Sequence, residues 1–160
     1  VARGVVASAV PVTLHIVPRG VSDRPLRLPG MDGMSQVVMH DRLSRSDYVG
    51  LLAVCDIGLA VTRKAAAPVI PEAACDFAGA GLAIVHDATG ELAELIAGHD
   101  AGVRYDRGDV AGAVRELAGL AADRRMLLSL QDAARRLAAA ALDRERLYTR
   151  FVDWLETLST

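Results

Sequence analysis

Two acidic side chains lie four residues apart in a segment that predicts a helix, beginning near Pro71 and ending at Gly81. Glu72 and Asp76 therefore project from one face of that helix near its start. Acids such as Glu72 stabilise a first turn even where no ligand binds. Asp76 gains less from the helix dipole, and aspartate has poor helix propensity. A carboxylate at this place can accept hydrogen bonds from a sugar diol, as acidic residues do for ribose in nucleotide sites.

Two turns near this helix have residues that suit a phosphate group. Arg63 and Lys64 lie in "RKAAAPVIPE", just before the free amide groups of the helix N-terminus, which favour an anion. Thr89, Gly90 and Glu91 form a second turn, where Gly90 lets the backbone approach a ligand and Thr89 can cap a helix or meet a phosphate oxygen. Solvated loop cations and plain capping explain the same residues without a ligand. Neither turn is a GxGxxG or Walker loop, so the glycines by themselves are not specific.

The elements that must position these residues alternate between strand and helix. We expect strands at Val12–Val17, Gln36–Leu43, Asp56–Thr62, Leu82–Asp87 and Ala101–Asp106, and helices at Ser44–Cys55, Pro71–Gly81, Thr89–Ala97, Val110–Ala122, Asp123–Ala141 and 143–158. The segment 21–36 predicts a long loop or a degenerate helix. Apolar strands joined by helices predict one parallel sheet with helices on either side. Ligands of such sheets bind outside the carboxyl ends of the strands.

Composition excludes several classes of protein. The chain has 160 residues, a formal charge of −2 and 52% apolar residues, which fits one domain with an ample core. It has no basic stripe for nucleic acid and no apolar run of the roughly 20 residues that span a membrane. We therefore expect a soluble cytoplasmic protein that binds no nucleic acid and has no integral membrane segment. The two cysteines lack CxxC spacing, so we expect no metal site.

The order of the segments resembles the C-terminal domain of GT-B glycosyltransferases of the large family-four type, or glycosyltransferase group 1. The specific part is "PEAACDFAGAGLAIVHDATGELAELI" (Pro71–Ile96), which is similar to that family's "PxKxxEYMAxGLPVV" pattern with its following turn and "ELAELI"-like helix. The segment "AGVRYDRGDVAGAVREL" likewise resembles the family's "GxxVPPGDxxALAxAI". The resemblance runs over nearly the whole chain. It implies an α/β fold, a Rossmann-like parallel sheet flanked by helices, as the C-terminal half of a GT-B enzyme.

The resemblance also implies an activity and a site. Such enzymes transfer a sugar from a nucleotide-sugar donor to an acceptor held by an N-terminal domain, here in polysaccharide or glycolipid biosynthesis. By motif position, Asp76 matches the helix glutamate that contacts the donor ribose, and Thr89, Gly90 and Glu91 match the turn near the donor diphosphate. No metal or other cofactor is implied, because basic side chains and helix N-termini offset the diphosphate charge. Residues 1–160 would form one nucleotide-sugar-binding domain, with 143–158 an amphipathic C-terminal helix.

The chain also departs from the family. Asp76 is one methylene shorter than glutamate, and Ala73 stands where many relatives carry lysine. The opening "VARGVVASAVP" looks like the end of a helix whose preceding strand, with its glycine-rich turn and Arg/Lys pair, is missing. We therefore expect an N-terminally truncated domain that does not catalyse transfer alone.

Two other interpretations belong to different classes of protein. The alternative is a non-catalytic Rossmann-like domain, derived from such an enzyme, that binds a nucleotide or a protein. A flavodoxin- or receiver-like domain would need an acidic cluster or a phosphate-binding loop after the first strand, and "VPRG" has neither.

Overall fold

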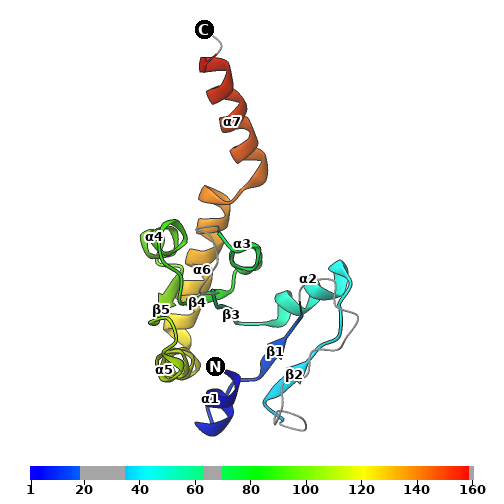
Figure 1. Cartoon of the computed structure of the whole chain (residues 1–160), viewed down its shortest axis with the longest axis vertical. Coiled ribbons are helices and arrows are strands. Elements are labelled where there is room, and N and C mark those ends of the chain that lie inside the picture. The colour runs from blue at the N-terminus through cyan, green and yellow to red at the C-terminus, as the bar shows by residue number, and fades with distance from the viewer. Residues whose placement is uncertain (19–34, 63–69, 159–160) are drawn as a thin grey trace.

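The computed structural model describes residues 1–18, 35–62 and 70–158 (Figure 1). Its elements, in chain order, are α1 (Ala2–Ala7), β1 (Leu14–Ile16), β2 (Val37–Met39), α2 (Arg45–Val54), β3 (Ile57–Ala60), α3 (Glu72–Ala80), β4 (Ala83–His86), α4 (Glu91–Gly98), β5 (Gly102–Arg104), α5 (Val110–Ala122), α6 (Arg124–Ala141) and α7 (Arg144–Leu158). The predicted loop or degenerate helix at 21–36 lies almost entirely outside the described residues.

The strands are parallel, as predicted, but they form two small sheets instead of one. β1 pairs with β2, with Leu14 opposite Val37, and the second sheet has the order β3-β4-β5. Helices flank the strands, so the chain is an α/β protein compatible with a Rossmann-like fold. The prediction of one continuous sheet is wrong because β1 and β3, the strands that would join the two halves, do not pair.

The central strand β4 separates two apolar layers, because its side chains point alternately to opposite faces. Ala83 and Val85 pack with residues of α1 and α5 in one layer, and Ile84 packs with residues of α3 and α4 in the other. All four residues of β4 are buried. This strand is therefore covered on both faces, as an interior strand of a parallel sheet must be.

Helix α6 crosses the amino edge of the three-stranded sheet and joins the two layers. The side-chain amide of Gln131 donates to the carbonyl of Asp56, which directly precedes β3, at 3.0 Å. Leu127 and Leu130 belong to the layer with α5, whereas Ala134 and Leu137, further along α6, belong to the layer with α3 and α4. Since α6 lies at the amino edge, it leaves the opposite, carboxyl edge uncovered.

The ends of several helices agree with the sequence. Gly81 ends α3 in the left-handed conformation (φ 72°), and the backbone of Leu82 donates to Phe77 across the turn at 2.9 Å. Helix α5 has the predicted bounds, and α6 begins after Asp123, whose side chain accepts from the backbone amide of Met126. These features depend on neighbouring residues alone, which is why a local pattern predicts them.

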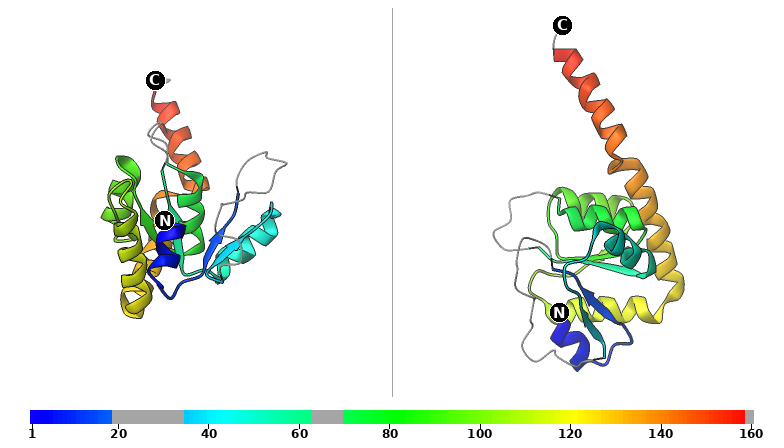
Figure 2. Two further views of the ribbon diagram at one scale, coloured as in Figure 1. Left: turned by 60° about the horizontal axis from the view of Figure 1, so that its bottom comes forward. Right: turned by 90° about the vertical axis from the view of Figure 1, so that its right-hand side faces the viewer.

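Helix α7 extends away from the rest of the molecule, as both views in Figure 2 show. None of its residues is buried. Its apolar side chains are at least 43% exposed, including those of Leu147, Phe151, Trp154 and Leu158. The apolar stripe predicted in this segment is therefore present but has no cover from the described part of the chain.

Candidate functional site

The carboxyl edge of the β3-β4-β5 sheet gathers a set of polar side chains. Asp87, which directly follows β4, is 3% exposed. One of its carboxylate oxygens accepts two hydrogen bonds from Thr62, from the backbone amide at 2.7 Å and from the hydroxyl at 2.8 Å. The guanidinium of Arg107 in turn donates to the Thr62 hydroxyl at 2.8 Å. We call these three residues the Asp87 cluster; it fixes the loops after β3, β4 and β5 relative to one another.

Two further buried side chains lie beside this cluster. His86 is 2% exposed and Tyr105 is 6% exposed. The Nδ1 atom of His86 and the hydroxyl of Tyr105 have no hydrogen-bond partner among the described residues. By alternation with Val85, His86 points to the face covered by α3 and α4. Buried polar atoms are nearly always paired, so these two are candidates for contact with a ligand at this edge.

Burial determines the protonation behaviour of both groups. It lowers the pKa of His86 below its ordinary value; the Arg104 charge adds to this effect and the Asp87 carboxylate partly opposes it. Burial also raises the pKa of the Tyr105 hydroxyl, and the charge of Asp87 raises it further. At neutral pH the edge thus has a neutral imidazole and a neutral phenol, both able to donate a hydrogen bond.

Helices α3 and α4 begin at this edge without a side-chain cap. The N-cap residue is Pro71 for α3 and Gly90 for α4, and neither has a side chain that accepts a hydrogen bond from a backbone amide of its helix. By contrast, α2, α5 and α6 are capped by Ser44, Asp109 and Asp123. The amide groups of the first turns of α3 and α4 are therefore not used by a capping side chain, which is the condition for binding an anion there.

The turn at Thr89 differs from the prediction in one respect. Thr89 does not cap α4, because the helix begins one residue later and Gly90 takes the cap position with φ 69° and ψ −149°. Essentially only glycine adopts this conformation. Thr89, Gly90 and Glu91 are all exposed. Glu91 lies in the first turn of α4, where its charge stabilises the helix and competes with any bound anion.

Asp76 lies one turn into α3 and is half-buried. The hydroxyl of Tyr48 in α2 donates to its Oδ2 atom at 3.3 Å. Glu72, one turn earlier on the same face, is exposed at the start of α3. The structure therefore brings Glu72 to the carboxyl edge with the Thr89 turn, and places Asp76 further along α3 in contact with α2. Arg63 and Lys64, the predicted diphosphate ligands, lie outside the described residues.

A hollow lies between the two sheets, lined by residues of β1, α2, β3 and α3. This intersheet groove has a volume of about 750 Å³. Tyr48, Ala73 and Phe77 line its side formed by α2 and α3, so the Tyr48–Asp76 contact lies at its border. Asp76 thus contacts a residue that lines the groove, whereas no residue of the Thr89 turn lines it.

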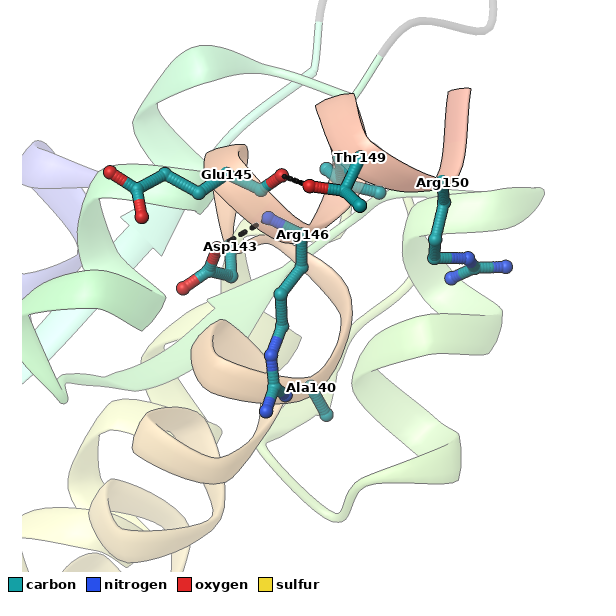
Figure 3. Close-up of a pocket in the computed structure, with 7 residues that line it drawn as sticks. Ala140, Asp143, Glu145, Arg146, Thr149 and Arg150 are labelled. Carbon is teal, nitrogen blue, oxygen red and sulfur yellow. Dashed lines mark hydrogen bonds between the residues drawn. The ribbon is translucent and has the colours of Figure 1, made fainter. Parts of the chain in front are cut away.

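A second hollow, of about 490 Å³, lies where α6 meets α7 (Figure 3). Its lining comes from one short stretch of chain, residues 140–150. The backbone amide of Arg146 donates to Asp143 at 2.9 Å, and the Thr149 hydroxyl donates to the Glu145 carbonyl at 3.0 Å. The sheet contributes no residue to this hollow, so it is a feature of the turn between two helices and not part of the predicted site.

The residues of the Asp87 cluster, with His86 and Tyr105, were not among the predicted donor-binding residues. A signal for them exists in the sequence, because Thr62, Asp87 and Tyr105 each stand at or just beyond the carboxyl end of a predicted strand. What the sequence does not contain is their burial and mutual contact. Both depend on the register of three strands that are distant in the chain.

Within the described residues, no group of three or more His, Cys, Asp or Glu side chains could hold a metal ion. Among the described helices, none combines the length and the apolar character that crossing a bilayer requires. Neither a protein-family model nor a curated protein matches the chain.

Proposed function

We propose that the chain is the donor-binding half of a glycosyltransferase and binds a nucleotide-sugar at the carboxyl edge of β3 and β4. The observation that carries the proposal is the pair of uncapped helix N-termini, α3 and α4, after neighbouring parallel strands. An anionic diphosphate is a ligand that helix N-termini without a side-chain cap favour. The backbone conformation of Gly90 supports the proposal, because it leaves no side chain between the turn and a ligand.

The proposed roles follow from the placement of each residue. The diphosphate would lie against the first turns of α3 and α4, near the Thr89 turn. Asp76 would accept hydrogen bonds from the ribose hydroxyls, in competition with its contact to Tyr48. Arg107, which the Asp87 cluster holds at the same edge, adds a positive charge that offsets part of the phosphate charge. These contacts need no metal ion.

Transfer itself would require a second domain that holds the acceptor, and this chain alone would not catalyse it. The exposed apolar face of α7 supports such a partner, because large apolar patches outside a folded core commonly mark docking surfaces. The reaction proposed is transfer of a hexose to a polysaccharide or glycolipid precursor.

The test is calorimetric titration of the chain with UDP- and GDP-sugars. We expect binding for one of them, and we expect Asp76→Ala to weaken it by about tenfold, which corresponds to about 1.4 kcal/mol. Tyr48→Phe is the matched control: it removes the hydroxyl that donates to Asp76 but keeps the carboxylate, so donor affinity should be equal or higher. Absence of heat at millimolar donor would refute the proposal.

One observation favours a second candidate, a non-catalytic Rossmann-like domain that binds a nucleotide or a protein. The Tyr48 hydroxyl already engages Asp76, so this carboxylate has a structural role that joins α2 to α3. In that case Asp76→Ala and Tyr48→Phe would lower the thermal midpoint alike, and neither would change an affinity for nucleotide-sugars.

A further inference from the structure

The intersheet groove separates two strand edges that lack a partner among the described residues. β1 is paired on one side only, with β2, and β3 on one side only, with β4. The groove is lined by five consecutive residues, Thr13–Val17, along β1, and by Cys55, Asp56, Ile57 and Leu59 along β3. Side chains of consecutive strand residues point to opposite faces, so a cavity that touches all of them lies along the edge of the strand.

The hydrogen bonds show which backbone groups face this groove. Leu14 donates to the Gln36 carbonyl at 2.8 Å, and Ile16 accepts from His40 at 2.9 Å, so these two residues are directed to β2. In a parallel pair, alternate residues direct both backbone groups to the same side. His15 therefore directs its N–H and C=O away from β2, to the groove.

The same argument applies to β3. The carbonyls of Asp56 and Ala60 accept from Ala83 and Asp87, so these residues are directed to β4. Ile57 and Leu59, which alternate with them, direct their backbone groups to the groove. Each side of the groove thus presents an open parallel ladder.

Burial indicates that both strands belong in the interior of a sheet. β3 is apolar throughout, as is typical of strands covered on both faces, and β1 has an apolar residue on either side of His15. β4, which has a partner on each side, is buried throughout, whereas Leu14 and Ile16 of β1 and Ile57 and Leu59 of β3 remain only half-buried. The groove also exposes part of Phe77 to the same space. One more strand would pair both edges and cover these side chains.

We propose that the groove receives one further strand, which runs parallel to β1 and β3 and is joined to the N-terminal side of α1. With this strand, X, the order becomes β2-β1-X-β3-β4-β5, which is the order of a doubly wound sheet whose first strand lies at the centre. That order assigns X to the position before α1, so that X, α1 and β1 form one strand–helix–strand unit.

The packing of α1 fits this connection. Val5 is fully buried in the layer that contains α5, and Gly4 approaches Val110 and Val114 so closely that a Cβ atom there would lie 2.9 Å from each. α1 therefore already covers the face of the sheet that a connecting helix must cover. The strand itself would consist of about five residues that are apolar on both faces, with Val and Ile preferred.

The test is a pair of chains with N-terminal extensions joined to Val1 by a short Gly/Asp turn. One extension has about five Val and Ile residues; the control has the same length but proline at alternate positions, which cannot donate to a ladder. Amide hydrogen exchange at His15, Ile57 and Leu59 is compared between them. We expect exchange at least about tenfold slower with the Val/Ile extension, in a monomer. Leu14, already bonded to β2, reports in both chains that the sheet is intact.

Three results would overturn the proposal: equal exchange in the two chains, protection only when the strand peptide is added unlinked, or protection in a dimer of the unextended chain, detected by sedimentation. The last would mean that a second copy occupies the groove. Titration with nucleotide-sugars is a separate measurement, so failure of the proposed function and failure of this inference are distinguishable.

Discussion

At the scale of single residues, the most constrained part of the proposed site is the carboxyl edge around β4. Asp87 is buried but satisfied by the two donors of Thr62, whereas the neighbouring His86 has an Nδ1 atom with no partner among the described residues. A buried imidazole of this kind opposes its own protonation. The stability of the domain should therefore depend on pH through His86.

We predict that the free energy of unfolding falls between pH 7 and pH 5, and that His86→Leu removes part of this slope. The pKa of His86 is lowered in the folded state, so below about pH 6.5 the unfolded chain binds a proton that the folded chain resists. The contribution of His86 to the free energy of unfolding is thus fully present above that pH and decreases below it. Urea denaturation across this range measures the slope. An unchanged slope in His86→Leu would contradict the assignment, with Asp106→Asn as an exposed control at the same edge.

At the scale of elements, the start of α4 depends on a backbone conformation and not on a capping side chain. Gly90 has φ 69°, yet a Cβ atom added to it would meet nothing within 4 Å. A substitution there therefore tests backbone strain without a steric clash. Gly79, exposed inside α3, also has open space around it but has helical geometry. The two glycines form a matched pair.

Gly90→Ala should destabilise the domain by about 1 to 3 kcal/mol, the usual cost of a non-glycine residue in a rare backbone region. Gly79→Ala should stabilise it by up to about 1 kcal/mol, because alanine loses less conformational entropy in a helix. Chemical denaturation measures both. If the proposed function is correct, Gly90→Ala also weakens donor binding, whereas Gly79→Ala does not. Equal effects of the two substitutions on stability would show that the Gly90 conformation is not required.

At the scale of the whole molecule, α7 contributes apolar surface but no buried residue. The last residue along the chain that packs in either layer of the core is Leu142, which directly follows α6. The body should therefore fold without α7, and α7 should act as a surface for a partner.

We predict that removal of residues 144–160 changes the free energy of unfolding of the body by no more than about 0.5 kcal/mol. It should also lower the binding of an apolar dye, since Phe151 and Trp154 leave with the helix. Fluorescence and denaturation of the shortened chain measure both effects. The full-length chain with both aromatic residues changed to serine is the control. A loss of several kcal/mol on truncation would instead show that α7 packs on the body.

The sequence by itself determined the elements and their class. Helix ends such as Gly81 and Asp123, and the apolar character of β4, depend on residues that are neighbours in the chain, so local patterns predict them. The predicted strands are longer than the observed ones, because the composition of a segment does not show where its backbone pairing with another strand stops. The sequence also predicts the position of the turn at Thr89, although the N-cap residue of α4 is Gly90 and not Thr89.

Only the tertiary structure decided which strands pair, which polar groups meet and which apolar faces remain open. The contact of Tyr48 with Asp76 and the Asp87 cluster join residues at least 25 positions apart in the chain. The separation of β1 from β3 depends on which strands pair across the whole fold. Each is a balance between burial and backbone hydrogen bonding across the whole fold. A pattern within one segment contains neither term, which is why the groove between the sheets could be found only in three dimensions.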